Sequence, residues 1–262
     1  MNLTASYKYQ LMDHKNAIII FYAVFAVLFL LSLTFLATST SLVVTDGEES
    51  LETYWEGGGQ SQVSGIEAAG VIFLFVMGLC TFKEPFKMLA QNGVSRKTLM
   101  AGKLLTMVSV AAFMAVADKL IGLGLALLSR MSGQHIIYRT LYESVYPGRA
   151  GEVSAAGFQA ESFLYAFVLY LAAMAAGYFL TLLFYRLPKG GKIAVGVGVP
   201  VFVMVYPLMD LLLTGGQVSM ALMQLIYRLF GAALPAIASF FGCFLLLMLV
   251  CWLLMRRAVV RA

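Results

Sequence analysis

Three ionisable residues, Asp118, Lys119 and Asp210, lie inside long apolar runs of the chain. Charge at membrane depth is costly, and such residues often line the path of an ion or substrate. A Lys119–Asp210 pair, or a site centred on Asp118, is therefore a candidate polar site on a translocation path. The alternative, which we favour, is that these side chains extend to the outer surface and form one structural ion pair.

The depth of these residues follows from helix geometry. If their helices enter the membrane at Lys103 and Ile193, Asp118 lies ~22 Å along the first and Asp210 ~25 Å along the second. Both residues would then lie in the outer part of a hydrocarbon core ~30 Å thick.

The motifs of enzyme chemistry are missing from the sequence. The Gly-Lys pairs at 102–103 and 191–192 lack the upstream glycine and the following Ser or Thr of a phosphate-binding loop. The two histidines, His14 and His135, lie outside the apolar runs and form no H-E-x-x-H motif. A G-x-S-x-G motif and a cluster of metal-binding side chains are also absent. We therefore expect a protein without catalytic residues, bound cofactor or metal.

The composition indicates a membrane protein. The chain has 262 residues, of which 61% are hydrophobic and 12% are charged, whereas soluble domains are about 45–50% apolar and about 25% charged. The net charge is +5, but the cations flank apolar runs and form no basic stripe, so we expect no nucleic-acid partner. The three cysteines, Cys80, Cys243 and Cys251, lie in apolar runs, where we expect them to be buried as small hydrophobic side chains.

Six apolar runs are long enough to suggest membrane-spanning helices, each needing about 20 residues. The expected fold is thus all-α, with a single transmembrane domain over residues 1–262. An S-x-x-E capping box at Ser64 and Glu67 precedes the second run. Pro188 separates the fourth and fifth runs, and a Thr-Gly-Gly sequence at 214–216 ends the fifth. The expected spans are roughly 17–37, 65–82, 104–129, 162–185, 193–214 and 235–255.

The distribution of basic residues predicts the orientation, because cytoplasmic loops are enriched in Lys and Arg. Of the 18 Lys and Arg residues, 13 fall in segments on the same side as the N-terminus, four fall on the other side, and Lys119 lies within a span. Both termini are therefore expected in the cytoplasm. The four on the outer side are Arg130, Arg139, Arg149 and Arg228.

Three further segments fit neither a span nor a short loop. Residues 1–16 place apolar side chains on one helical stripe, which predicts a helix lying on the cytoplasmic interface. Residues 131–160 are expected to form a long outer loop. Residues 217–230 have apolar side chains at three- and four-residue spacing but are too few to span, so we expect an interfacial or re-entrant outer helix.

The segment 83–103, between the second and third runs, is expected to be a cytoplasmic loop with local order. Pro85 can begin a short helix, and Asn92-Gly93 can end it, because both residues tolerate the left-handed conformation. Ser95 can then cap the helix that continues into the third span. A force on the short helix would be transmitted directly to that span.

With these features the chain resembles the membrane subunit of ABC transporters of the type-2 exporter (ABC-2) superfamily. The match in organisation covers nearly the whole chain, while the match in residues is confined to the stretch F-x-x-L-x-x-x-G-V-S-R-K-T-L-x-x-G-K-L-L at 86–105. The outer loop after the third span is longer than the family pattern.

The resemblance implies that the loop forms a coupling helix, which docks in a groove of a separate ATP-binding subunit. It also implies two permease subunits, identical or different, with ATP and Mg²⁺ held by the partner ATPase. The expected location is the plasma membrane of a bacterial cell. The implied coupling contacts are Phe86, Leu89, Gln91, Asn92, Gly93, Ser95, Arg96 and Lys97.

By this resemblance the chain is the permease of an exporter for a peptide, lipid or drug-like substrate. Two alternatives remain open from the residues alone. One is an ion-coupled secondary transporter that uses Asp118 or Asp210. The other is a membrane immunity or scaffold protein that transports nothing.

Overall fold

The computed structural model describes residues 3–42, 61–63, 65–82, 86, 88–89, 91–132 and 136–256. Three residues named in the sequence analysis, Ser64, Pro85 and His135, lie outside the described residues. Helices dominate the described chain, which confirms the predicted all-α class apart from one pair of three-residue strands. In order, the elements are α1 (Leu3–Leu42), β1 (Ser61–Val63), α2 (Ile66–Cys80), α4 (Arg96–Ser132), β2 (Ile136–Tyr138), α5 (Leu141–Val145), α6 (Arg149–Glu152), α7 (Ala155–Arg186), α8 (Lys189–Thr214), α9 (Gln217–Phe230) and α10 (Ala233–Arg256).

Five of the described helices are long and apolar enough to cross a membrane: α1, α4, α7, α8 and α10. The chain is therefore built as a multi-pass membrane protein. The sixth expected span corresponds to α2, which has only 15 residues and a length of about 22 Å.

The N-terminal segment differs from the expected interfacial helix. Residues 3–16 are helical, but they continue without a break into the apolar run, so that α1 has 40 residues and a length of about 60 Å. Of the predicted stripe of Leu3, Tyr7, Leu11 and His14, the structure buries His14. Ser6, Gln10 and His14, spaced by four residues, are buried, because they face the N-terminal part of α4, where a side chain on Gly102 would meet Ser6 and Gln10.

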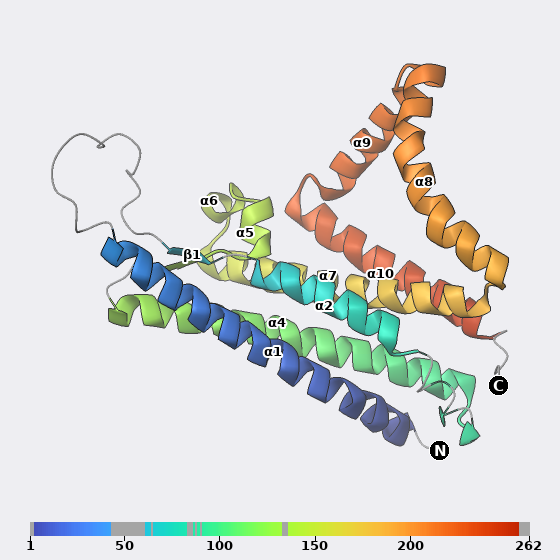
Figure 1. Cartoon of the computed structure of the whole chain (residues 1–262), viewed down its shortest axis with the longest axis horizontal. Helices are drawn as coiled ribbons and strands as arrows, with labels where there is room; N and C mark the ends of the chain where they lie inside the picture. Colours follow the sequence, from blue (N-terminus) through green and yellow to red (C-terminus); the bar gives the residue numbers. More distant parts are fainter. Residues whose placement is uncertain are drawn as a thin grey trace.

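The core of the bundle lies where α7 packs between α2, α4 and α10 (Figure 1). The helices α2 and α7 approach each other closely because Gly78 faces Gly177. A Cβ on Gly177 would meet Leu79 N at 3.0 Å and the Gly78 Cα at 3.1 Å. Packing within this chain therefore accounts for the absence of a side chain at Gly177.

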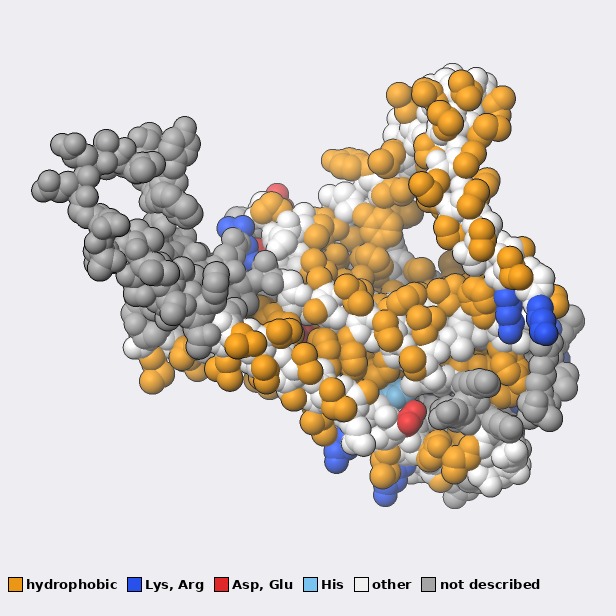
Figure 2. All heavy atoms as spheres, viewed as in Figure 1, with side chains coloured by type: hydrophobic (Ala, Val, Ile, Leu, Met, Phe, Trp, Pro, Cys, Tyr) orange, Lys and Arg blue, Asp and Glu red, His pale blue; other side chains and the backbone are white. Residues whose placement is uncertain are grey.

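Both described chain ends, the turn at 92–95 and the break between α7 and α8 lie at one end of the bundle (Figure 1). Many of the visible Lys and Arg side chains lie toward this end, over the N-terminal part of α1 and the α7–α8 junction (Figure 2). We call it the basic end. Apolar side chains cover much of the remaining visible surface (Figure 2), as expected for helices in contact with lipid.

The segment 131–160 is largely ordered rather than a loop. The helix α4 extends to Ser132 and α7 begins at Ala155, so the bounds of the expected loop are too wide. Between them, β2 pairs in parallel with β1, and Thr140 caps α5, since its side chain accepts the Glu143 N–H at 3.1 Å. We call β1, β2, α5 and α6 together the cap.

The helices α8 and α9 stand away from the bundle and form two sides of a triangle that closes on α10 (Figure 1). The helix α8 ends at Thr214, and Gly215 and Gly216 both have positive φ angles, 65° and 84°. The helix α9 occupies the range expected for the amphipathic segment and has no buried residue. Within the described chain, nothing lies within 4 Å of a Cβ placed on Gly190 or Gly198. These two glycines of α8 therefore make no close helix contact within the described chain.

Candidate functional site

The turn before α4 is the first candidate site. Asn92 and Gly93 form the turn, and Gly93 has a φ of 71°, which glycine adopts without strain. The Ser95 hydroxyl accepts the Thr98 N–H at 3.2 Å, as an N-capping serine does. The local geometry thus agrees with the sequence: a left-handed turn, then a serine that begins a long helix.

Two residues expected to contact a partner instead belong to the core. Phe86 is 3% exposed and Leu89 is 1% exposed. The Phe86 ring stacks on Phe82 with centroids 5.0 Å apart and contacts Tyr185 at 6.1 Å. The apolar stripe of the segment faces its own bundle, so these two side chains present little surface to a partner in this structure.

The side chains that remain accessible form a polar surface, which we call the turn surface. Met88 is 47% exposed, and the sequence had not singled it out. Arg96 also donates to the backbone oxygen of Arg256 at 2.5 Å, which joins the turn to the end of α10. The exposed members of the turn surface are Met88, Gln91, Asn92, Gly93, Ser95, Arg96 and Lys97.

A buried polar network lies directly behind the turn surface. Lys103 is 3% exposed, and its Nζ donates to Thr81 Oγ1 at 2.8 Å and lies 3.2 Å from His14 Nε2. The same Nζ is 5.5 Å from the centre of the Tyr178 ring. Sequence reasoning had treated Lys103 as a loop cation. The signal for this network was the four-residue spacing of Ser6, Gln10 and His14.

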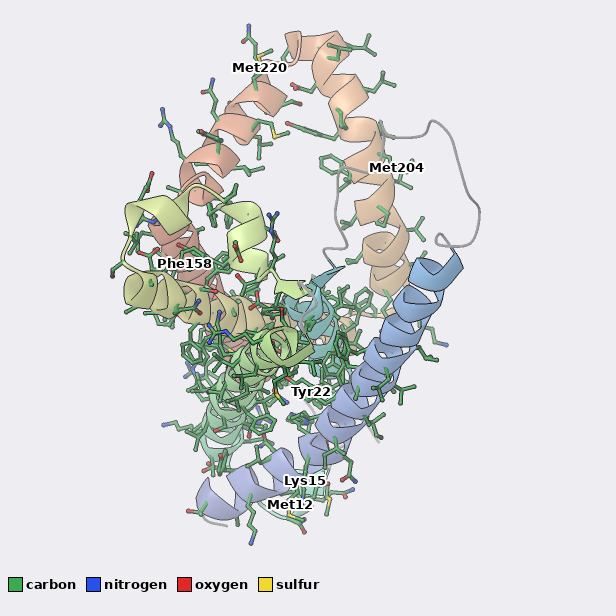
Figure 3. All side chains as sticks on the ribbon, turned by 90° about the vertical axis from the view of Figure 1, so that its left-hand side faces the viewer. Met12, Lys15, Tyr22, Phe158, Met204 and Met220 are labelled. Carbon is green, nitrogen blue, oxygen red and sulfur yellow. The ribbon has the colours of Figure 1, made fainter. Side chains whose placement is uncertain are left out.

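A second polar cluster lies deeper in the bundle and contains Asp118. Its Oδ1 accepts the Tyr22 hydroxyl at 3.1 Å, and its Oδ2 accepts the Tyr170 hydroxyl. Figure 3 shows Tyr22 on α1, turned toward the interior of the bundle. The neighbouring Lys119 donates to Ser162 Oγ on α7 at 2.6 Å. Asp118 and Lys119 thus belong to one cluster, as the sequence suggested.

Asp210 lies elsewhere and has a different role. It accepts the Ser219 N–H at 2.8 Å and the Thr214 hydroxyl, so it holds the first turn of α9 against the end of α8. Among the described residues no ion pair joins it to Lys119. The expected Lys119–Asp210 pair is therefore not formed in this structure, because α8 stands away from α4.

Glu67 joins the cluster around Asp118, although the sequence placed it in a capping box. The residue before α2 is Gly65, and it makes no side-chain capping bond. Glu67 instead accepts the Leu141 N–H at 2.7 Å through Oε2, which ties the beginning of α2 to the cap. It is 2% exposed, and its Oε1 has no hydrogen-bond partner among the described residues.

The cap is fastened by a second set of polar contacts. Glu161 on α7 accepts both Arg149 Nε and an Arg149 terminal nitrogen at 3.2 Å, and it accepts the Tyr142 hydroxyl at 2.5 Å. Burial, and the Glu161 carboxylate beside it, raise the pKa of Tyr142 to about 12. The pair formed by Glu161 and Arg149 is a bidentate pair of the kind that fixes geometry.

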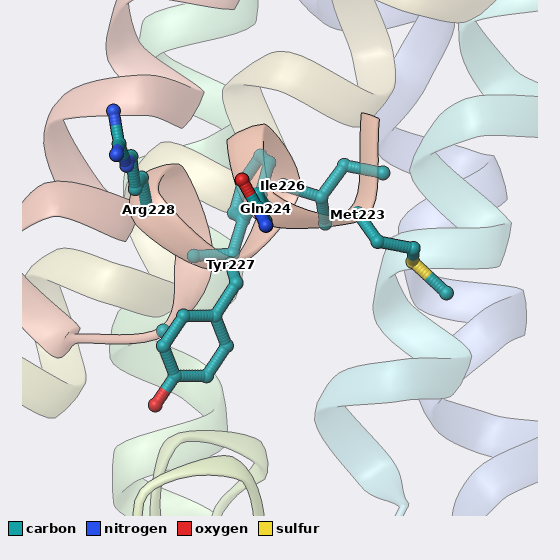
Figure 4. Close-up of a pocket in the computed structure, with 7 residues that line it drawn as sticks. Met223, Gln224, Ile226, Tyr227 and Arg228 are labelled. Atoms are coloured by element: carbon teal, nitrogen blue, oxygen red, sulfur yellow. The ribbon is translucent and has the colours of Figure 1, made fainter. Parts of the chain in front are cut away.

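The remaining features carry no site of their own. A hollow of about 600 Å³ beside α9 (Figure 4) is lined only by that helix and the following glycine, so it is an open flank rather than an enclosed pocket. The described residues contain no group of three His, Cys, Asp or Glu able to hold a metal. Cys251 is buried as expected, whereas Cys80 and Cys243 are exposed on helix faces.

The chain matches no family model, and no curated protein or solved structure matches it significantly.

Proposed function

We propose that the chain is the membrane-spanning permease of an ATP-driven exporter, working with a separate ATP-binding subunit. The observation that supports this most is the construction of the turn surface. Phe86 and Leu89 anchor the segment in the core, while Gln91, Asn92 and Lys97 face outward. A partner that binds and displaces this surface would therefore also displace the helices of the bundle.

The position of the turn surface agrees with this proposal. It lies at the basic end of the bundle, with both described chain ends (Figure 1), and the distribution of Lys and Arg favours the cytoplasm for that end. The helix α4 leads from the turn to Asp118, about 33 Å along it, without interruption. Displacement of the turn would thus reach the polar cluster through one rigid element.

The resemblance of residues 86–105 to ABC-2 permeases implies that the partner is an ATP-hydrolysing subunit. The chain has no phosphate-binding loop, so nucleotide hydrolysis must come from another protein. We further propose two permease subunits per transporter and a location in the plasma membrane of a bacterium. The exported substrate is a peptide, lipid or drug-like molecule.

Site-specific photo-crosslinking in intact cells tests the proposed partner. A photoreactive amino acid at Met88 or Lys97 should form a cross-link whose second component mass spectrometry identifies as a P-loop ATPase. The control position is Met131, which is 87% exposed at the opposite end of α4. Cross-links to lipid alone from Met88 and Lys97, or the same ATPase captured from Met131, would contradict the proposal.

A second candidate function is ion-coupled transport. The observation that favours it is the burial of Glu67 and Asp118, at 2% and 1% exposure, next to Lys119. Asp210 no longer supports this candidate, since it caps α9. Transport by purified chain in vesicles under an ion gradient, with no ATPase present, would favour this candidate over the exporter.

A further inference from the structure

The cluster around Asp118 contains more negative than positive side-chain charge. Glu67 from α2 and Asp118 from α4 are both buried, and Lys119 is the basic side chain that acts on both. Within the described chain, no ion pair involves Glu67, Asp118 or Lys119. With both carboxyl groups ionised, the cluster would carry one uncompensated negative charge, which burial makes very costly.

The hydrogen bonds distinguish the two carboxyl groups. Both oxygens of Asp118 accept phenol hydroxyls, from Tyr22 and Tyr170, and donors of this kind stabilise the charged carboxylate. The donors to Glu67 are backbone N–H groups of the cap, Leu141 on Oε2 and the neighbouring Tyr142. Glu67 Oε1 is buried without a partner among the described residues, so Glu67 is the group whose charge is least supported.

A second unpartnered group lies in the same cluster. The Tyr138 hydroxyl is buried and has no partner within the described chain. Burial raises the pKa of Tyr138, and the nearby carboxylates of Glu67 and Asp118 raise it further. The Tyr138 ring packs on α4 at Gly122, one turn beyond Asp118, where an added Cβ would meet Tyr138 Cε1 at 2.7 Å. Two unpartnered polar groups therefore face the same buried region.

The number of available oxygens decides which ligand this region takes. Hard metal cations collect about six oxygen ligands. Both Asp118 oxygens and Glu67 Oε2 already accept hydrogen bonds, which leaves Glu67 Oε1 and the Tyr138 hydroxyl. These are the two unpartnered oxygens of the described cluster, fewer than the about six that a hard cation collects. One proton, in contrast, removes the excess charge and needs only one oxygen.

We propose that Glu67 is a buried proton-binding site, and that its carboxyl group holds one proton at neutral pH while Asp118 stays ionised beside Lys119. The step is a simple protonation of one carboxylate oxygen, with no other bond made or broken. The proposal does not rest on the exporter assignment, since it concerns only the charge of buried side chains inside the helix bundle.

The environment of Glu67 includes titratable groups from every element packed around it. Tyr22 comes from α1, and Asp118 and Lys119 come from α4. The cap contributes Tyr138, the Tyr142 backbone N–H, and Glu143, which acts on Lys119. The helix α7 contributes Tyr165 and Tyr170. Lys119 is the basic side chain among these groups and Glu143 adds a further acidic one, so negative charge remains in excess.

Infrared difference spectroscopy of the purified full chain tests the proposal. Wild type minus Glu67→Gln at neutral pH should show the carbonyl band of one protonated carboxylic acid. The matched control is Glu152→Gln, because Glu152 is 66% exposed on α6 and should give no such band. Absence of the band for Glu67→Gln would overturn the proposal, as would its appearance for Asp118→Asn instead.

Two further measurements keep the proposal falsifiable. The protonated band should be unaffected when Na⁺ replaces choline, and its loss on adding Na⁺ would show a metal-cation site instead. The second measurement is the pH dependence of the unfolding temperature of the wild-type protein. A carboxyl that is protonated when folded and ionised when unfolded favours folding at low pH, and this contribution is lost as the folded group titrates. The unfolding temperature should therefore fall as the pH rises above the ordinary glutamate pKa of about 4.3, and a flat profile would overturn the proposal.

Discussion

Lys103 Nζ donates to Thr81 Oγ1 at 2.8 Å and lies 3.2 Å from His14 Nε2. This contact joins three helical segments at the basic end: the beginning of α1, the end of α2 and the beginning of α4. No acidic side chain of the described residues forms an ion pair with Lys103. Its ammonium group is stabilised by the Thr81 hydroxyl oxygen, which accepts its hydrogen bond, and by the Tyr178 ring, while Asp13 acts on it without forming an ion pair.

A buried charge without an ionic partner costs stability, so its replacement should be stabilising. We expect Lys103→Met to raise the free energy of unfolding by about 1 kcal/mol, because the relief of charge burial exceeds the loss of the Thr81 hydrogen bond. Thermal unfolding in detergent measures this, with exposed Lys97→Met as the control. A clear loss of stability in Lys103→Met alone would show that the network is structural.

The contact between α2 and α7 depends on two glycines. A Cβ on Gly177 would meet the Phe75 backbone oxygen and the Gly78 Cα, and backbone atoms cannot move aside without separating the helices. We expect Gly177→Val to destabilise the chain by about 1–3 kcal/mol. Gly198→Val is the matched control, since nothing in the described chain lies within 4 Å of that position. Equal effects of the two substitutions would contradict the packing.

The Tyr142–Glu161 contact predicts an optical titration. Burial, and then Glu161, raise the pKa of Tyr142 to about 12, above the usual value of about 10. The stability that this phenol contributes is therefore present below about pH 10 and is lost as pH rises through 12.

Glu161→Gln should lower the pKa of Tyr142, because it removes the negative charge next to the phenol. Phenolate absorbance, taken as the difference from the Tyr142→Phe variant, measures this change. An unchanged titration in Glu161→Gln would mean that burial alone sets the pKa.

Local sequence patterns predicted the turn and the helix class well. Asn92-Gly93 and Ser95 encode their conformation in neighbouring residues, and Gly93 and Ser95 adopt it. The end of α8 is similarly local, since Gly215 and Gly216 take the left-handed conformation that ends a helix.

The polar clusters could not be predicted in this way. Tyr22 and Asp118 are 96 residues apart in the sequence, and Tyr170 and Asp118 are 52 apart, so no spacing rule connects them. The sequence around Glu67 fitted a capping box equally well. Only the folded structure shows that Glu67 instead accepts the backbone N–H of Leu141 in the cap. Tertiary placement, rather than propensity, decides which polar residues of a membrane bundle meet.

The burial of Phe86 predicts how the turn surface responds to mutation. Phe86→Ala removes a ring from the core, and we expect it to cost about 3–5 kcal/mol of stability. Met88→Glu changes an exposed residue of the same segment and should leave the unfolding temperature unchanged. If the turn surface docks an ATPase, Met88→Glu should nevertheless reduce both co-purification of that ATPase and its stimulation.

The two substitutions thus separate folding from coupling. Lys97→Glu is a second exposed change, and it should act as Met88→Glu does if charge on the turn surface matters for docking. Exposed Met131→Glu at the other end of α4 should alter neither stability nor ATPase binding. If Met88→Glu and Lys97→Glu retain full ATPase binding while Phe86→Ala loses it in proportion to its lost stability, the turn surface is not the docking surface.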